Sequence, residues 1–381
     1  MKRIVFVMNI PSPYRLHTFS ALWSECKHQG VDLHVHFMAR WHKERPLSWR
    51  NPQIDFPHTF WRDSGIKTYH WNPGLVRELL RNPPDWIHLG SPFDTFTCIV
   101  LALTVRKSIL CAGCEGNTKT PGVMDGFKGW FKRYIFSKCK YVTVPGVDGA
   151  RYIALHQMLT KNKMPEPLML PNLVDETRFR PRTEWSPKEI MDARNDMGAN
   201  SETRLCIIPA RLEPVKGLLP FIKQLTSEML AGWRIVILGQ GSLKNQILNS
   251  LAQRHIQEHF IIMDYVPYDK MPLYYASADL LLLPSIYDPN PLSVPEALFS
   301  GLPIALTDQA GNVEEGVTAN KNGWVLPVND SEKYSSVLKK VFSSTKEDLA
   351  AKGKCSVEEN AQFWSTEKSV RSYLDAVIGK C

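Results

Sequence analysis

The second half of the chain repeats one unit, namely a short apolar strand, a loop rich in Gly, Pro and charge, and an amphipathic helix. The strand segments are 205–208, 235–238, 260–263, 280–283 and 304–306. Uninterrupted apolar runs of this length are typical of strands that are buried on both faces of a parallel sheet. The repeat between residues 204 and 327 therefore predicts a doubly wound α/β domain.

In the first half of the chain, predicted strands and helices also alternate, though less regularly. We predict strands over 3–9, 32–37, 86–89, 108–111, 141–144 and 168–170, and helices over 14–29, 74–81, 93–106, 126–138 and 148–159. This is a second doubly wound domain. We expect an N-terminal domain over 1–172, a C-terminal domain over 173–362, and a last helix over 363–381 that crosses back to the first domain. The proline-containing stretch 171–187 is the expected connector.

Composition fits this reading. A chain of 381 residues with 44% hydrophobic and 22% charged residues has the length and balance of a two-domain globular protein. The start, with Lys2 and Arg3 before an apolar run, resembles a secretory signal, but Asn9, Pro11 and Pro13 interrupt it. No apolar run reaches the roughly 20 residues of a membrane span. We expect a cytoplasmic protein.

The cysteines give no strong signal. Of the eight, only Cys111 and Cys114 have C-x-x-C spacing, and no second pair accompanies them. Buried thiols are favoured over a zinc or redox site. No Asp-x-Asp motif or His cluster appears, so we expect no metal.

Charge is distributed unevenly. Residues 1–183 hold 26 Lys and Arg against 14 Asp and Glu, whereas residues 184–381 hold 20 against 24. A basic first half favours an acidic partner, such as anionic lipid, a phosphorylated glycan or nucleic acid, although a solvated basic surface that aids solubility is also open. Residues 127–141 interleave aromatic residues with Lys and Arg. This pattern suits an anionic membrane surface, although a helix that covers the sheet gives the same periodicity and is favoured.

Polar residues follow the strands of the second half. Arg211 and Lys216 come after the first strand, and Gly239 and Gly241 end the next one. Two cations at a helix start suit a diphosphate, because free backbone N–H groups also point there. Solvated charges and a tight G-x-G turn are the alternatives.

The sharpest signal is the pair Asp288 and Glu296, which flank a Pro-rich loop. We expect Leu292 and Ser293 to open a helix whose N–H groups hold a phosphate, while the two carboxylates bind sugar hydroxyls. The alternative is a capping box, in which Glu296 serves only the N-terminus of its own helix that starts at Ser293.

Together these motifs resemble the nucleotide-sugar domain of family 4 glycosyltransferases, which are retaining enzymes of GT-B architecture. The matching segments are 210–217, 236–241, 284–288 continuing through 296–303, and 311–315, with 171–175 similar to the family's exit from the first domain. The resemblance implies two Rossmann-like domains facing across a cleft. It implies that Arg211 and Lys216 hold the diphosphate, Glu296 the ribose and Val266 the base side, with Asp288 facing the donor sugar. The residues that we assign to the donor are Arg211, Lys216, Gly239, Gly241, Val266, Asn290, Leu292, Ser293 and Glu296.

The chain departs from the family pattern in three places. Asp288 stands where a glutamate is usual, which affects the preferred donor sugar. The glycine-rich loop after the first strand is replaced by 11–15, so that Arg15 or His17 takes over an acceptor-side contact. The family's first-domain histidine is absent, and Glu115 occupies its place as a candidate catalytic contact, although a solvated surface role fits it equally. His88, at a strand end, is a further acceptor-side candidate, and a structural role fits it as well.

The predicted function is transfer of a sugar from a nucleoside diphosphate, UDP or GDP, to an acceptor hydroxyl on a glycan or lipid-linked glycan of an envelope polysaccharide pathway. The resemblance implies no cofactor beyond the donor. The expected catalytic residues are Arg211, Lys216, Asp288, Glu296 and Glu115. We expect the protein to act in the cytoplasm or at the inner face of the membrane. A phosphorylase or epimerase of the same architecture, and a non-catalytic nucleic-acid-binding protein, are the alternatives.

Overall fold

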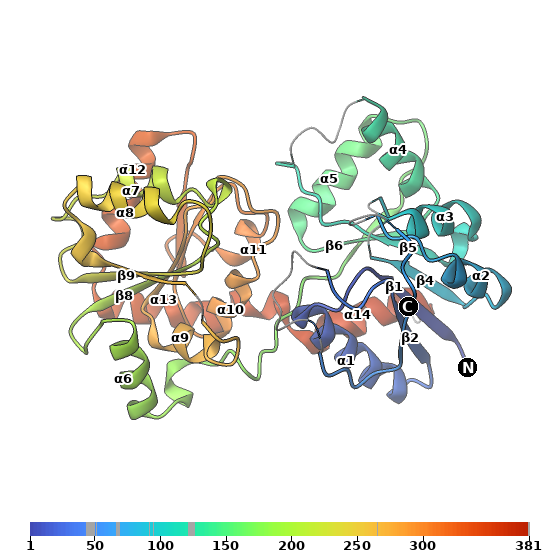
Figure 1. The fold of residues 1–381 in the computed structure, drawn as a ribbon, viewed down its shortest axis with the longest axis horizontal. Helices are drawn as coiled ribbons and strands as arrows, with labels where there is room; N and C mark the ends of the chain where they lie inside the picture. The colour runs from blue at the N-terminus through green and yellow to red at the C-terminus, as the bar shows by residue number, and fades with distance from the viewer. Residues whose placement is uncertain are drawn as a thin grey trace. The chain divides into compact units, whose positions relative to one another are not determined.

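The computed structural model describes residues 1–42, 50, 52–65, 69–90, 92–93, 95–120, 126–264 and 266–379. The chain forms two compact units (Figure 1), one of Met1–Leu173 with Thr366–Cys381 and one of Val174–Ser365. The sequence placed these boundaries at residues 172 and 363. Each unit is a parallel α/β sheet with helices on its faces.

The described part of the first unit contains a seven-stranded sheet of order β3-β2-β1-β4-β5-β6-β7 in which neighbours run parallel. Its strands are β1 (Arg3–Met8), β2 (Asp32–Phe37), β3 (His58–Phe60), β4 (Trp86–Leu89), β5 (Leu110–Gly113), β6 (Tyr141–Val144) and β7 (Glu166–Met169). Its helices are α1 (Pro13–His28), α2 (Pro73–Arg81), α3 (Phe96–Thr104), α4 (Gly126–Ser137), α5 (Val147–Met158) and α14 (Thr366–Ile378). The edge strand β3 was not predicted, because three half-buried residues make no recognisable run.

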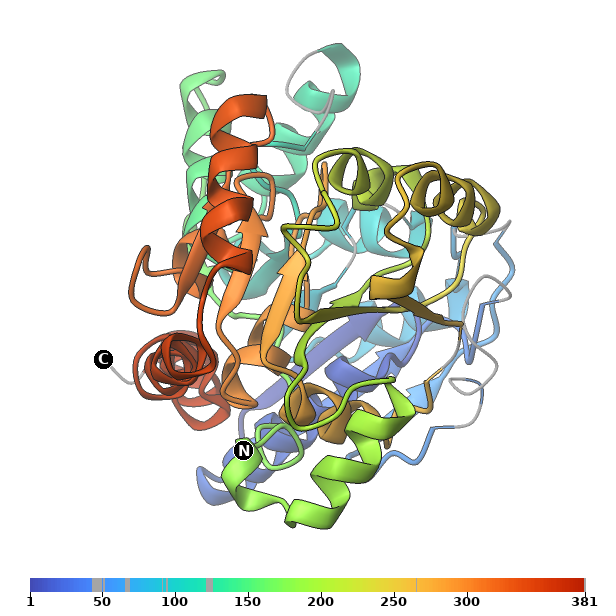
Figure 2. The same ribbon diagram turned by 90° about the vertical axis from the view of Figure 1, so that its left-hand side faces the viewer.

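The described part of the second unit contains a six-stranded parallel sheet of order β10-β9-β8-β11-β12-β13. The strands are β8 (Arg204–Pro209), β9 (Trp233–Leu238), β10 (Phe260–Met263), β11 (Leu280–Leu283), β12 (Ile304–Thr307) and β13 (Gly323–Leu326). The helices are α6 (Pro187–Asp196), α7 (Leu218–Lys223), α8 (Lys244–Gln253), α9 (Met271–Ser277), α10 (Ser293–Phe299), α11 (Val313–Gly316), α12 (Ser331–Phe342) and α13 (Lys346–Glu358). Helices cover both faces of this sheet (Figure 2).

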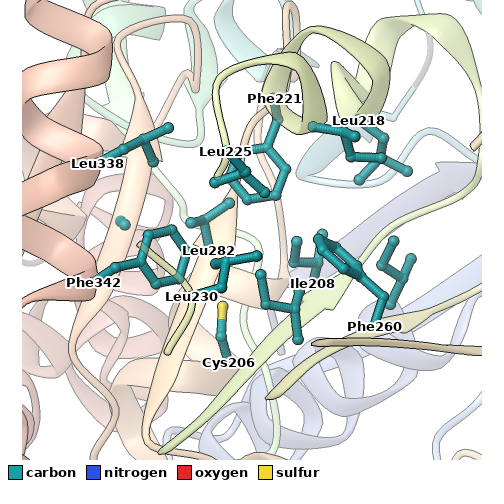
Figure 3. Close-up of a cluster of buried hydrophobic side chains, with 14 of the residues drawn as sticks. Cys206, Ile208, Leu218, Phe221, Leu225, Leu230, Phe260, Leu282, Leu338 and Phe342 are labelled. Atoms are coloured by element: carbon teal, nitrogen blue, oxygen red, sulfur yellow. The ribbon is translucent and has the colours of Figure 1, made fainter. Parts of the chain in front are cut away.

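The apolar strand runs are buried on both faces, as their composition predicts. Along β8, Cys206 and Ile208 point into one core with residues of α7 and α12 (Figure 3), while Leu205 and Ile207 join a second core with α9 and α10. The first sheet divides its residues between two cores in the same way. A parallel strand with helices on both sides has no solvated face, so every position can be apolar.

Both sheets have the strand order 3-2-1-4-5-6 of a doubly wound fold, with β7 added at one edge of the first. In such a sheet the order reverses between the first and fourth strands, and ligands bind beyond the carboxyl ends of the strands at that point. The reversal lies between β1 and β4 in the first unit, and between β8 and β11 in the second. These two places are where a site is expected.

Candidate functional site

In the second unit, two predicted site residues meet at the point of strand reversal. Lys216 follows β8 in a short 3-10 helix (Pro214–Lys216), and Asp288 follows β11. Their side chains form an ion pair, and both are largely buried. The pair thus spans the two loops between which an open α/β sheet places its ligand.

Backbone contacts hold these two loops together. The carbonyl of Val215 accepts a hydrogen bond of 2.9 Å from the N–H of Ile286. Gly217 has a φ of +66°, and a Cβ at that position would meet the Pro284 carbonyl oxygen at 2.0 Å. Only glycine allows both the left-handed conformation and the close approach, so Lys216 is fixed from its C-terminal side.

Arg211 lies in the same loop as Lys216 but is exposed. Its side chain makes no ion pair or hydrogen bond with any residue that the structure describes. The loop therefore presents one cation that is already neutralised by a carboxylate and one that is free. A guanidinium group without a partner is suited to an anionic ligand, because it loses no protein contact on binding.

The glycines after β9 have a packing role. A Cβ at Gly239 would meet the Ala210 carbonyl oxygen at 2.2 Å, and one at Gly241 would meet that of Leu212 at 2.5 Å. The loop after β9 thus lies directly against the loop that carries Arg211. The N–H of Ser242 is occupied, since it donates to the Glu213 carboxylate at 3.2 Å. Contact of Gly239 and Gly241 with the donor stays a prediction.

Glu296 lies in the first turn of α10 and is bound by a residue that the sequence did not point to. The hydroxyl of Tyr275, on α9, donates a hydrogen bond of 2.6 Å to Oε2 of Glu296. Burial raises the pKa of Glu296 to about 7, although the Tyr275 hydrogen bond and the nearby Arg178 lower it. The capping-box alternative is wrong, because α10 has no side-chain cap and the Glu296 carboxylate is bonded to another helix.

The remaining residues predicted to contact the donor are Asn290, Leu292, Ser293 and Val266. Asn290 keeps its Nδ2 buried and without an acceptor among the described residues. The N–H groups of Leu292 and Ser293 donate to no backbone carbonyl in the described chain, because α10 begins there. Val266 is half-buried and packs on the core shared by α9 and α10.

The first unit has its own pocket at its point of strand reversal. Residues at the carboxyl ends of β1, β4, β5 and β6 line it, together with α1 and the segment after β7. Two predicted acceptor-side residues, Arg15 and His88, are among them, as is Glu115, which was predicted to contact the donor sugar or an acceptor hydroxyl. His17 is not, and its Nε2 lies 3.0 Å from Oγ1 of Thr366 instead.

The polar rim of this pocket is held by local hydrogen bonds. Arg15 donates to Oδ1 of Asn9 at 3.0 Å, which ties it to the end of β1. Asn172 donates to Oε2 of Glu115 at 3.1 Å, while Glu115 stays exposed. The pocket therefore offers both a cation and a carboxylate, a set that suits a polar, hydroxyl-bearing ligand.

His88 is 5% exposed and fixed by hydrogen bonds at both ring nitrogens. Its Nδ1 lies 3.0 Å from the Tyr373 hydroxyl, and its Nε2 lies 3.3 Å from Oγ1 of Thr143. Burial, with Arg15 nearby, lowers the pKa of His88 to about 3, so the ring is neutral at ordinary pH. Tyr373 belongs to α14, and the sequence indicated it only as part of an apolar helix face.

Comparison with protein families finds a match within the second unit. Residues 190–354 match the family described as "Glycosyl transferases group 1". The match includes the strand reversal that carries Lys216, Asp288 and Glu296.

The curated relatives that the chain matches are glycosyltransferases by name. One is the protein named "Putative colanic acid biosynthesis glycosyltransferase WcaL" of Escherichia coli. It is 27% identical over 186 residues, which are 46% of this chain and 42% of the relative. The amylovoran biosynthesis glycosyltransferase AmsK of Erwinia amylovora is 25% identical over 163 residues, 40% of each chain. The alignments thus span about two fifths of these relatives' length. They support the glycosyltransferase class predicted from the sequence.

Solved structures match over the whole length. A sucrose-phosphate synthase from Thermosynechococcus elongatus gives a TM-score of 0.75 at 11% identity and covers 100% of this chain and 99% of its own. WaaG, a glycosyltransferase involved in lipopolysaccharide biosynthesis, gives 0.70 at 15% identity, covering 99% and 100%. Anabaena HepE, solved in complex with UDP and glucose, gives 0.69 at 14% identity, with the same coverage. The GT-B prediction of two Rossmann-like domains is therefore confirmed at the level of the fold.

Proposed function

We propose that the chain is a retaining glycosyltransferase of family 4 that transfers a sugar from a nucleoside-diphosphate sugar to an acceptor hydroxyl. The observation that carries the proposal is the pair Lys216–Asp288 at the strand reversal of the second unit, with the unpartnered Arg211 in the same loop. This arrangement lies within the segment that matches the glycosyltransferase family.

The donor diphosphate would bind through Arg211 and Lys216. Arg211 is free to form a charge-assisted pair with a phosphate oxygen, whereas Lys216 must leave Asp288 or share its charge with it. The released carboxylate of Asp288 then becomes available to hydroxyls of the donor sugar. Asn290, with its buried and unsatisfied Nδ2, supplies a further donor beside the same loop.

Glu296 would bind the ribose of the donor. A carboxylate can accept hydrogen bonds from two vicinal hydroxyls, and Oε2 is already oriented by Tyr275. Val266, half-buried on the same core, would lie toward the base. The similar HepE structures were solved in complex with UDP or UDP-glucose, which supports UDP as the first nucleotide to test.

Catalysis would rest on charge and positioning. The leaving diphosphate gains negative charge as the bond between it and the sugar breaks, and the cations Arg211 and Lys216, once bound to the diphosphate, stabilise that charge. In the retaining reaction the acceptor attacks on the face from which the diphosphate leaves, and a phosphate oxygen takes the acceptor proton. The proposal therefore assigns no separate base, and no metal or cofactor, to the reaction.

The acceptor would bind in the pocket of the first unit. Arg15 and Glu115 suit the hydroxyl and phosphate groups of a glycan or of a lipid-linked glycan, and His88 presents a neutral ring to the same pocket. The relatives named for amylovoran and colanic acid biosynthesis support an envelope polysaccharide as the product class. The proposal places the enzyme in the cytoplasm, at the inner face of the membrane.

Donor binding and turnover test the proposal. We expect UDP, or else GDP, and its sugars to raise the melting temperature, because a ligand at 100 times its Kd adds about 2.7 kcal/mol of stability. NMR of the product from a cognate acceptor should show the donor's anomeric configuration. Sugar conversion without any acceptor would indicate an epimerase, and dependence on inorganic phosphate a phosphorylase.

A further inference from the structure

A series of buried hydrogen bonds ends at the pocket of the first unit. It begins at Trp86, whose indole N–H can only donate and lies 3.2 Å from the Tyr373 oxygen. The Tyr373 hydroxyl accepts that bond and in turn donates to Nδ1 of His88 at 3.0 Å. The neutral His88 ring then holds its proton at Nε2 and donates it to Oγ1 of Thr143 at 3.3 Å. Every bond of the series points from the core toward the pocket, which His88 and Thr143 line.

Thr143 is the last member of this series, and its own proton is left for a ligand. A threonine hydroxyl offers one O–H donor besides its acceptor lone pairs. The oxygen accepts from His88, and no hydrogen bond from the Thr143 hydroxyl to another described residue is present. The side chain is 5% exposed and lines the pocket. A buried donor without an acceptor costs about 1–3 kcal/mol, so a ligand oxygen at this position would be stabilised.

Apolar side chains make up much of the wall around this hydroxyl. Phe6 and Phe19 are both buried, with ring centroids 5.1 Å apart, and they line the pocket together with Leu170. Gly113 lines it as well, and its missing side chain leaves open a position 3.4 Å from Nε2 of His88, where a Cβ would lie. A charged group would lose its hydration against such a wall, whereas a methyl group is favoured there.

The exposed rim of the pocket supplies a hydrogen-bond acceptor. Asn172 donates to Oε2 of Glu115 at 3.1 Å, which occupies one of the two carboxylate oxygens. The other oxygen accepts no hydrogen bond from a described residue, and the Glu115 side chain is exposed. The pocket thus combines a buried donor, an apolar wall and a carboxylate at its rim.

We propose that this pocket binds an acetamido group, so that the acceptor is a glycan whose terminal sugar is N-acetylated. The inference rests on the proposed function and names the acceptor class of that reaction. Each part of an acetamido group matches one feature of the pocket. Its carbonyl oxygen accepts from Thr143, its methyl group contacts the apolar wall, and its N–H donates to Glu115. A plain hydroxyl would leave the wall against water, and a uronic acid would place a second carboxylate near Glu115.

Saturation-transfer NMR with the whole chain, without a sugar donor, tests this. The probes are the methyl glycosides of N-acetylglucosamine and N-acetylgalactosamine, compared with those of glucose, galactose and glucuronic acid. We expect an N-acetylated probe to bind at least about fivefold more tightly than the probe that differs from it only at C2, because a hydrogen bond and a buried methyl group both add to affinity. The acetyl methyl protons should receive the strongest saturation.

Thr143→Val keeps the shape of the side chain but removes its hydroxyl. We expect it to lower the affinity for the preferred N-acetylated probe by about threefold to tenfold, the effect of one neutral hydrogen bond. Thr143→Ser is the matched control, because it keeps a hydroxyl beside His88 and should bind like the wild type. Thermal melts of both variants separate loss of binding from loss of folding.

Gly113→Ala tests the space for the methyl group independently. The added Cβ would come no closer than 3.4 Å to its neighbours, which is an ordinary contact, so the variant should fold. It should weaken the N-acetylated probe by at least about tenfold, because an overfilled pocket excludes the acetyl group. The probes with a C2 hydroxyl should be affected less.

Three results would overturn the proposal. One is binding of the N-acetylated probes that is absent, or no tighter than that of their C2-hydroxyl counterparts. Another is tighter binding of the glucuronic acid probe, and the third is unchanged binding in both Thr143→Val and Gly113→Ala. The assay contains no nucleotide. A protein that binds UDP but shows no acetamido preference would therefore contradict only this inference, whereas failure to bind any nucleotide sugar would contradict the proposed function.

Discussion

The hydroxyl of Tyr275 donates a hydrogen bond of 2.6 Å to the carboxylate of Glu296. The two residues come from neighbouring helices, α9 and α10, and the bond orients the one acidic side chain that we assign to the ribose. Burial raises the pKa of Glu296 to about 7, so this carboxylate changes its charge within the physiological range. A residue with that property gives the proposed site a measurable pH dependence.

We expect donor affinity to rise with pH through about 7, because only the ionised Glu296 accepts hydrogen bonds from both ribose hydroxyls. Glu296→Gln should abolish this pH dependence and weaken UDP binding by about tenfold to a hundredfold, the usual range for a lost hydrogen bond to a charged group. Titration calorimetry with UDP between pH 5.5 and 8.5 measures both effects. An unchanged pH profile in Glu296→Gln would exclude this residue as the cause.

The pH dependence of folding stability has the opposite sign to that of donor affinity. A folded-state pKa above the ordinary value means that folding favours the protonated form of Glu296. Its contribution is therefore complete below the unfolded pKa, near pH 4, and is lost as pH rises through about 7. Tyr275→Phe removes a hydrogen bond that lowers the pKa of Glu296. It should therefore move the pH midpoint of donor affinity and that of stability to higher pH. Tyr274→Phe is the control, since its hydroxyl bonds Asp196 at 3.4 Å and not Glu296.

Substitution of Arg211 and substitution of Lys216 should affect donor binding alike but stability differently. Arg211→Ala removes a side chain without partners, so the free energy of unfolding should change by less than about 0.5 kcal/mol while UDP affinity falls by about tenfold or more. Lys216→Ala should reduce both, because it leaves the largely buried Asp288 unpaired. Thermal melts and UDP titrations of the two variants make the comparison. Equal loss of stability in both would contradict the difference between a free and a paired cation.

Gly217 should be needed for its close contact with Pro284, and not only for its positive φ. Gly217→Ala adds a methyl group that would meet the Pro284 carbonyl oxygen at 2.0 Å, at a φ of +66°. Gly30 provides a matched control, with a φ of +65° and no atom within 4 Å of an added Cβ. We expect Gly30→Ala to cost about 1 kcal/mol from backbone strain, and Gly217→Ala clearly more, with loss of UDP binding. Urea unfolding of the two variants measures the difference.

Local pattern accounts for most of the fold. The boundaries of β4, β6, β10 and β11 agree with the apolar runs in the sequence, because charged or turn-forming residues bound those runs. β13 was not assigned, since it begins at Gly323, where a Cβ would meet the Ile304 carbonyl oxygen at 2.0 Å. The glycine is required by close packing, and it also shortens the apolar run by which a strand is recognised.

Two of the predicted site residues, Lys216 and Asp288, lie in loops that follow strands, and the sheet topology brings these two loops together. Tyr275 and Tyr373 stand within helices, where a tyrosine has the same spacing as any core residue. Their hydroxyls act on partners 21 and 285 residues away, Glu296 and His88. Sequence periodicity reports which face of a helix is buried, but not which polar atom that face meets.

The hydroxyl of Tyr373 sets the tautomer of His88. The indole N–H of Trp86 can only donate, and it lies 3.2 Å from the Tyr373 oxygen, which therefore accepts. The buried hydroxyl proton of Tyr373 then finds its acceptor at Nδ1 of His88, 3.0 Å away. The neutral ring accordingly carries its proton at Nε2, on the side of Thr143 and the pocket. His88 is thus held with its Nε2–H donating to Oγ1 of Thr143, and both residues line the pocket.

Tyr373→Phe should release this control. We expect a loss of about 1–3 kcal/mol in stability, because Trp86 and His88 each lose a buried hydrogen-bond partner. Nitrogen NMR of the His88 ring should change from the single Nε2–H form to a mixture. The KM for the acceptor should rise several-fold while UDP affinity, which we assign to the second unit, stays the same. Tyr334→Phe, at a buried tyrosine of the second unit, controls for loss of a hydroxyl. A stability loss with an unchanged tautomer and acceptor KM would reduce Tyr373 to a packing residue.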